Sequence, residues 1–159
     1  MSYEKNKIAQ EIGYLVIAFN LLENCIDIVL FEILHSRTNE FGKIITEGYS
    51  FSRKLHLLKK MYQSYLDASG EENGRKELTT LIGKIKSANT KRNKMVHAAW
   101  EEYFYDNLKK EVRTRWKTSK GQITELTISA NSESILNIKK EIEKLDELLF
   151  NFHEKYYYT

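Results

Sequence analysis

The spacing of apolar residues along the chain predicts four long helices. From about Glu4 to His35, apolar side chains recur at steps of three and four residues, which is the period of one helical face. The residues of this face are Ile8, Ile12, Leu15, Val16, Phe19, Leu22, Ile26, Val29, Leu30 and Ile33. The same period returns in segments 53–68, 75–99 and 132–156, and polar stretches that contain glycine or serine separate them.

A different period, of two residues, marks the segment between the third and fourth helices. β-forming residues alternate there with basic ones, in the run Val112, Arg113, Thr114, Arg115, Trp116 and Lys117. A second run rich in β-formers covers residues 122–129, and Lys120-Gly121 lies between the two runs. We expect a small β-hairpin with its turn at Lys120-Gly121, and a third strand near residues 100–105.

Four helices joined by short connections favour an antiparallel arrangement. The predicted fold is mainly α: an up-and-down four-helix bundle with a small β-hairpin inserted between helices three and four, at roughly 100–130. At 159 residues the chain is long enough to bury a core, and we expect a single domain, 1–159.

The composition argues against several kinds of site. Cys25 is the only cysteine, so no internal disulfide or thiolate metal cluster can form, and its apolar helical surroundings predict a buried, unreactive thiol. The four histidines show no metal-ligand spacing, and the sequence has no glycine-rich phosphate loop. We expect no metal and no cofactor.

Polar residues interrupt the long apolar stretches. The N-terminal segment 1–10 is polar and charged, and Asn20, Glu23, Asn24 and Asp27 break the apolar run of the first helix. We therefore expect a cytoplasmic protein without a membrane-spanning segment.

The positive charge is concentrated in the middle of the chain. The whole sequence has a net charge of +3, whereas segment 53–120 has 17 Lys/Arg against 8 Asp/Glu, a local balance of +9. A basic middle between acidic flanks is typical of a surface that attracts polyanions, and a set of solvated lysines on helix backs is the alternative.

Six residues in this basic segment, Arg92-Asn93-Lys94-Met95-Val96-His97, combine three kinds of chemistry. Arginine is always charged and presents a planar fork that fits phosphate oxygens. Histidine can take and give a proton near neutral pH, and the asparagine amide both donates and accepts hydrogen bonds. Phosphodiester cleavage without a metal requires this combination, so Arg92, Asn93 and His97 are candidate catalytic residues for cutting RNA.

Two charged residues are predicted to point inward. Arg92 falls on the apolar stripe of the third helix, and Glu23 lies in the middle of the apolar face of the first. A buried charge is costly unless a counter-ion meets it. One interpretation is that Glu23 forms a structural ion pair with Arg92 or Lys54. The other is that Glu23 belongs to the catalytic site and holds Arg92 or His97 in place.

The hexapeptide resembles the Arg-x(4–6)-His motif of the HEPN superfamily, in its Arg-Asn-x-x-x-His form. Segments Phe19–Asn24 and Ser50–Lys54, Trp100 and the expected β insertion are similar to features of this superfamily, although only the hexapeptide is specific. The resemblance implies a helical homodimer in which two motifs face each other across a cleft. It also implies a metal-independent endoribonuclease, often a toxin of a toxin–antitoxin or defence system, with an antitoxin protein as a possible partner.

In this interpretation an RNA 2′-OH attacks the adjacent phosphorus and gives a 2′,3′-cyclic phosphate. His97 transfers protons, Arg92 stabilises the phosphorane charge and Asn93 orients His97 or a phosphate. The residues expected to guide the RNA backbone are Lys54, Lys91, Lys94, Arg113, Arg115 and Lys117. The alternative is a non-catalytic helical dimer that binds RNA, a nucleotide or a partner protein through the same polar cleft.

Overall fold

The computed structural model describes residues 3–34, 46–97, 112–119, 122–129 and 132–158, and the side chains of 3–6 and 112–129 are not part of this description. Four long helices lie within these ranges: α1 (Tyr3–Leu34), α3 (Phe51–Ser69), α4 (Glu72–Val96) and α5 (Ser132–Tyr157). Their ends agree with the predicted ends to within three residues. The prediction of a mainly helical protein is therefore confirmed.

Two strands lie between α4 and α5 in the sequence. β1 (Val112–Ser119) pairs antiparallel with β2 (Gln122–Ser129), in a register that runs from Val112 opposite Ser129 to Ser119 opposite Gln122. The predicted turn at 120–121 and the predicted strand near 100–105 lie outside the described residues. The complete insertion at 100–130 therefore stays a prediction.

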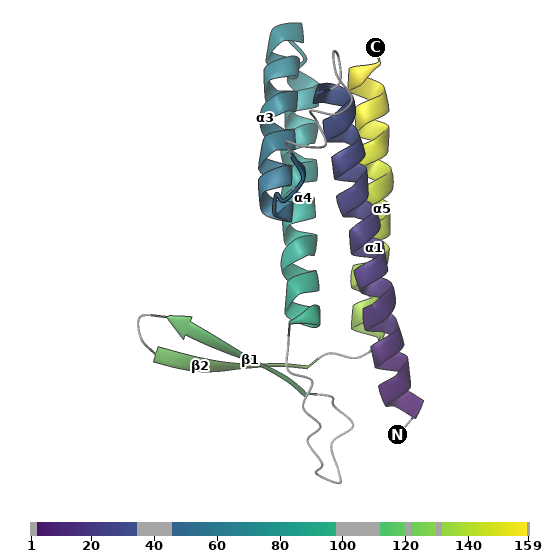
Figure 1. Ribbon diagram of the computed structural model, residues 1–159, viewed down its shortest axis with the longest axis vertical. Helices are drawn as coiled ribbons and strands as arrows, with labels where there is room; N and C mark the ends of the chain where they lie inside the picture. The colour runs from purple at the N-terminus through teal and green to yellow at the C-terminus, as the bar shows by residue number, and fades with distance from the viewer. Residues whose placement is uncertain (1–2, 35–45, 98–111, 120–121, 130–131, 159) are drawn as a thin grey trace.

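The predicted up-and-down order of the helices is wrong. Lys54 at the start of α3 contacts Glu23 in α1, and further along both helices Tyr62 and Glu32 meet through His153, so α1 and α3 run parallel. Cys25 of α1 lies beside Asp146 of α5, and seven residues further along both helices Glu32 lies beside His153, so α5 is parallel to α1 as well. Only α4 runs in the opposite direction, as Figure 1 shows.

The length of the connection after α1 explains this difference. α3 begins at Phe51, whose ring centroid lies 4.6 Å from that of Phe19, although α1 continues to Leu34. Fifteen residues of helix rise about 22 Å, and the 16 residues between Leu34 and Phe51 are enough to return over that distance. A connection of this length allows α3 to run parallel to α1. The expectation that short connections make successive helices antiparallel therefore does not apply to this pair.

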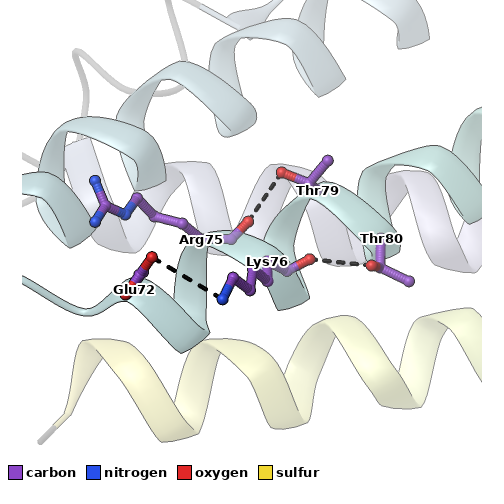
Figure 2. Close-up of a pocket in the computed structure, with 5 residues that line it drawn as sticks. All are labelled: Glu72, Arg75, Lys76, Thr79 and Thr80. Carbon is purple, nitrogen blue, oxygen red and sulfur yellow. Dashed lines mark hydrogen bonds and ion pairs between the residues drawn. The ribbon is translucent and has the colours of Figure 1, made fainter.

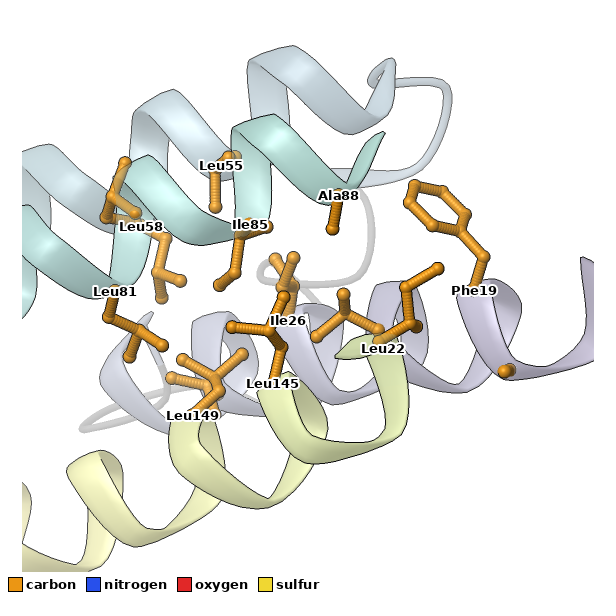
Figure 3. Close-up of a cluster of buried hydrophobic side chains, with 14 of the residues drawn as sticks. Phe19, Leu22, Ile26, Leu55, Leu58, Leu81, Ile85, Ala88, Leu145 and Leu149 are labelled. Atoms are coloured by element: carbon orange, nitrogen blue, oxygen red, sulfur yellow. The ribbon is translucent and has the colours of Figure 1, made fainter. Parts of the chain in front are cut away.

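The core is formed by the apolar stripes of all four helices, and Figure 3 shows its central part. Leu22 and Ile26 of α1 are fully buried, as are Leu58 of α3, Ile85 of α4 and Leu149 of α5. The inward residues predicted for the first helix are all buried or half-buried. Burial of each such side chain contributes about 2 kcal/mol to folding, so this core is the main source of stability.

A polar network joins three helices at the end of the bundle where the C-terminus lies. The Tyr62 hydroxyl and Nδ1 of His153 share a hydrogen bond, and Nε2 of His153 lies 2.6 Å from Oε2 of Glu32. Tyr157 donates to the Glu32 carbonyl at 2.7 Å, and Tyr158 donates to the Glu32 carboxylate at 2.7 Å. These bonds fix the C-terminal tyrosines to α1.

Burial favours the protonated form of two groups in the bundle, the Tyr62 hydroxyl and the Cys25 thiol. Burial, followed by the nearby Glu32 carboxylate, raises the pKa of the Tyr62 hydroxyl far above its ordinary value. Burial, together with the neighbouring Asp146 carboxylate, raises the pKa of the half-buried Cys25 thiol to about 12. Because the thiolate is the reactive form of cysteine, this raised pKa agrees with the predicted unreactive thiol, although Cys25 is half-buried rather than buried.

The turn between α3 and α4 is shorter than the predicted loop at 69–74. Gly70 ends α3 with φ of 73°, a left-handed conformation that glycine adopts without strain. Gly74, by contrast, lies inside α4 and is buried. A Cβ atom at Gly74 would lie 2.8 Å from Cδ2 of Leu66 and 2.9 Å from Cε1 of Tyr156, so this glycine allows α4 to pack closely.

Replacing Gly74 with alanine should therefore destabilise the protein by about 1–3 kcal/mol, because the added methyl overpacks the contact with Leu66 and Tyr156. Gly83 provides the matched control, since it lies in the same helix and a methyl group added there would have nothing within 4 Å. Gly83→Ala should stabilise the protein by up to about 1 kcal/mol through helix propensity. Urea unfolding measures both changes, and equal effects of the two substitutions would contradict the packing role of Gly74.

Candidate functional site

The predicted motif occupies the C-terminal end of α4. Residues 92–96 are helical, and His97 is the C-cap residue, whose backbone N–H donates to the carbonyl of Asn93 at 3.1 Å. The placement of the motif on a helix end is therefore as predicted. Basic side chains are favourable at this end of a helix because the last carbonyl groups carry partial negative charge.

Arg92 points into the bundle, as its position on the apolar stripe predicted. Its side chain is half-buried, and its Cζ atom lies 4.7 Å from the centroid of the Phe19 ring on α1. Phe19 in turn packs on Phe51 of α3. The guanidinium is thus held against an aromatic face, a cation–π contact of about 1–2 kcal/mol.

The polar atoms of Arg92 have few partners. Nη1 donates to Oδ1 of Asn93 at 2.9 Å, whereas the buried Nε has no hydrogen-bond partner among the described residues. Among the described residues, Glu23 and Asp27 bind Lys54 and Glu141 binds Lys91, and no carboxylate is paired with Arg92. Arg92 is therefore a partly desolvated cation that is oriented by a ring and an amide.

Asn93 and His97 differ in their surroundings. Asn93 is half-buried, and its side-chain oxygen is directed to Arg92. His97 is exposed at the end of the helix, and the described residues provide no hydrogen bond to its ring. Asn93 therefore contacts Arg92 and not the His97 ring, and its alternative role, orienting a phosphate, stays a prediction.

Glu23 is joined to Lys54 rather than to Arg92 or His97. The Lys54 ammonium lies 2.6 Å from Oδ2 of Asp27 and 3.1 Å from Oε1 of Glu23, and only 12% of the lysine side chain is exposed. Burial alone would lower the pKa of Lys54, but the hydrogen bonds from Asp27 and Glu23 outweigh it and raise this pKa. Of the two interpretations of Glu23, the ion pair with Lys54 is the contact that forms.

The other predicted RNA-binding residues fall into three groups. Lys91 is paired with Glu141 at 2.6 Å, and Lys94 is exposed in the last turn of α4. Arg113, Arg115 and Lys117 lie on β1, but their side chains are outside the described part of the structure. For Lys54 and Lys91, contact with a phosphate would require the ammonium to leave a carboxylate.

Sequence reasoning missed three residues that shape this region. The sequence pattern assigns Phe19 to the core and Phe51 to a connection, although together they support the guanidinium of Arg92. Asp27 was also missed as the second carboxylate on Lys54. Its spacing four residues after Glu23 was the available signal, because two carboxylates on one helix face favour a shared cation.

Two of the surface recesses in the described part of the chain are lined by residues outside the motif. The first lies at the opposite end of α4 and is lined by Glu72, Arg75, Lys76, Thr79 and Thr80, as Figure 2 shows. Its basic residues are paired, Arg75 with Asp67 and Lys76 with Glu72. The second contains Lys54 and Asp27. Among the described residues, no group of three or more His, Cys, Asp and Glu side chains could hold a metal ion.

Comparison of this chain with protein-family models, with curated proteins and with solved structures found no match.

The ion cluster of Lys54 yields a stability prediction. Lys54→Met keeps the aliphatic stem but leaves Glu23 and Asp27 facing each other without a cation, which should cost about 2–3 kcal/mol at neutral pH. Lys91→Met is the matched control, because the Lys91–Glu141 pair is more exposed and should contribute less than about 1 kcal/mol. Thermal and urea unfolding measure the difference. Similar losses for both variants would mean that the Lys54 cluster is an ordinary surface ion pair.

Proposed function

We propose that this protein is a metal-independent endoribonuclease that cleaves RNA by attack of a 2′-OH on the adjacent phosphorus, and that it acts as a toxin or defence effector. The observation that carries this proposal is the environment of Arg92. The resemblance of its hexapeptide to the HEPN motif supplies the reaction class.

The contrast between Arg92 and its basic neighbours supports an anionic ligand. Lys54 and Lys91 each lie within hydrogen-bond distance of a carboxylate. Among the described residues, by contrast, Arg92 contacts an aromatic ring and one amide oxygen, and its Nε atom has no hydrogen-bond partner. A partly desolvated guanidinium that meets no carboxylate among the described residues would be stabilised by an anion that arrives from outside. A phosphate would complete its hydrogen bonds, since the arginine fork matches two phosphate oxygens.

The proposed reaction needs one base and one acid. The base removes the proton of the 2′-OH, the new 2′-O–P bond forms, and the 5′-O–P bond breaks as the acid protonates the leaving oxygen. The products are a 2′,3′-cyclic phosphate and a 5′-OH. His97 takes one of these roles, and Arg92, held by Asn93, stabilises the charge on the non-bridging oxygens. In this proposal Glu23 has no proton-transfer role, because Lys54 engages it.

A second subunit is the proposed source of the other proton-transfer group. Of the other histidines that the structure describes, His56 is exposed on α3 and His153 is buried in the polar network with Tyr62. A homodimer in which two motifs share one RNA would supply a second His97. Lys94 and the β1 residues Arg113, Arg115 and Lys117 would guide the backbone, and an antitoxin would act by covering this surface.

The alternative proposal is a non-catalytic dimer that binds RNA, a nucleotide or a protein through the same residues. One observation favours it: no described side chain orients the His97 ring, whereas catalytic histidines are usually held by a second group. The fixed guanidinium of Arg92 would serve binding equally well. The two proposals differ in whether His97 changes the rate of bond cleavage.

We expect purified protein to cleave single-stranded RNA in the presence of EDTA and to leave 2′,3′-cyclic phosphate ends. His97→Ala should lower the cleavage rate by about two to four orders of magnitude, because the proton-transfer group is lost. His56→Ala is the matched control, since His56 is an exposed histidine on another helix and should leave the rate unchanged. Full activity of His97→Ala would refute the catalytic proposal. RNA binding without cleavage by the parent protein would favour the alternative.

For Arg92 we expect a larger loss of rate than of RNA affinity. Arg92→Met keeps an unbranched stem over Phe19 but removes the charge, and it should lower kcat by about 100- to 1000-fold with a small change in KM. Lys94→Met removes an exposed neighbouring charge and should weaken binding and its salt dependence while kcat is retained. Equal losses of kcat and affinity in Arg92→Met would assign Arg92 to binding alone.

A further inference from the structure

Helix α1 is apolar on two faces, and the described chain covers only one of them. Tyr14, Ile17, Leu21 and Ile28 face away from the core, and their exposed fractions are 44%, 57%, 57% and 46%. We call these four residues, together with the exposed Asn24, the outer stripe. A continuous exposed apolar patch on a folded protein is typical of an interaction site, so the outer stripe is a candidate site for a partner.

The spacing of the outer stripe is that of a helix–helix seam. From Tyr14 to Ile28 the steps alternate between three and four residues, 14, 17, 21, 24 and 28, which is the heptad pattern of coiled coils. The stripe therefore runs along about 20 Å of helix. Asn24 occupies one seam position, and a single amide at such a position is a known means of fixing the register between paired helices.

The charges around the outer stripe favour a second copy of the same surface. None of its five residues is charged. The two carboxylates nearest to Asn24 in the sequence, Glu23 and Asp27, are both bound to Lys54, at 3.1 Å and 2.6 Å. Two such stripes can therefore meet without repulsion between like charges. The Asn24 amides of the two copies can also hydrogen-bond to each other, since each amide is both a donor and an acceptor. We propose that the outer stripe of α1 packs against the outer stripe of a second copy of this chain.

A membrane is the other environment that an apolar helix can enter. By length and composition, the part of α1 at Lys7–Leu34 could cross a membrane, and 39% of its most apolar window is buried inside the protein. A core helix of a soluble bundle passes the same test. Helices that lie on membranes present lysine and arginine beside the apolar face, whereas the stripe is bordered by amides such as Gln10 and Asn20. The observations therefore favour a protein surface over lipid.

This interface is distinct from the one in the proposed function. At about 100° per residue, the four apolar residues of the stripe project roughly 140° to 220° away from Phe19, the ring on which Arg92 packs. Pairing through the stripe therefore leaves the two Arg92 sites on opposite outer sides of the pair. The stripe contact should be separable from RNA cleavage, and a protein that uses both interfaces would be a tetramer.

The first experiment compares the molar mass of the parent protein and of Leu21→Glu/Ile28→Glu by sedimentation velocity. Both positions are exposed, so the fold should persist, which circular dichroism checks. The double variant should have half the molar mass of the parent, while RNA cleavage per subunit stays unchanged. Asn137→Glu/Asn151→Glu is the matched control, because it adds the same charge to exposed positions of α5 and should leave the molar mass unchanged.

A second experiment uses charge complementation, so that a merely misfolded variant cannot be mistaken for a dissociated one. Leu21→Lys/Ile28→Lys should also have the halved molar mass. An equimolar mixture of the glutamate and lysine variants should regain the parent mass, because opposite charges would face each other across the seam.

Three results would overturn the proposal. One is an unchanged molar mass in both double variants, and another is a mixture that does not associate. The third is that the parent and the glutamate variant have the same molar mass, but only the parent binds phosphatidylcholine vesicles. That result would assign the stripe to lipid. Absence of RNA cleavage in all variants would contradict the proposed function only, since molar mass is measured without RNA.

Discussion

A helix as apolar as α1 cannot remain stable in water unless other surfaces cover most of its circumference. In this protein α1 contacts each of the three other helices, and its residues Leu15, Leu22, Ile26 and Leu30 are fully buried. The remaining helices carry charged residues on their outer faces, so each of them needs to bury only its inner face. The arrangement of the bundle follows from this difference, because α3, α4 and α5 are the partners that bury the inner faces of α1.

Polar contacts then select one arrangement among those that would bury the same apolar surface. Lys54 can meet Glu23 and Asp27 only if α3 starts near the middle of α1, and Tyr62 can meet His153 and Glu32 only if α3 continues in the same direction. Buried polar groups are costly without partners, so a shifted or reversed α3 would lose these contacts together. The two clusters therefore explain the parallel pairing that hydrophobic burial alone does not specify.

Periodicity predicted the helices well because local spacing determines which face is apolar. The same reasoning identified Arg92 and Glu23 as charged residues that point inward. It could not decide the direction of α3, since that depends on a 16-residue connection and on contacts between residues far apart in sequence. Nor could it decide whether Glu23 binds Arg92 or Lys54, because a helical wheel gives the face of a side chain and not its neighbour. The sequence pattern assigns Gly74 to a loop, because its packing against Tyr156 involves the far end of the chain.

The dipole of α4 explains why some residues of the motif are favourable at the end of this helix, but it does not explain the position of Arg92. Lys94 is favourable at a helix C-terminus whatever its function, since its positive charge complements the last carbonyl groups. Arg92 gains less from this effect, because it points inward to Phe19 and its Nε atom has no partner among the described residues. A structural arginine at this position would be expected to recruit a carboxylate, as Lys54 and Lys91 do. The lack of a counter-ion for Arg92 among the described residues is therefore a feature that stability does not explain and that an incoming phosphate would explain.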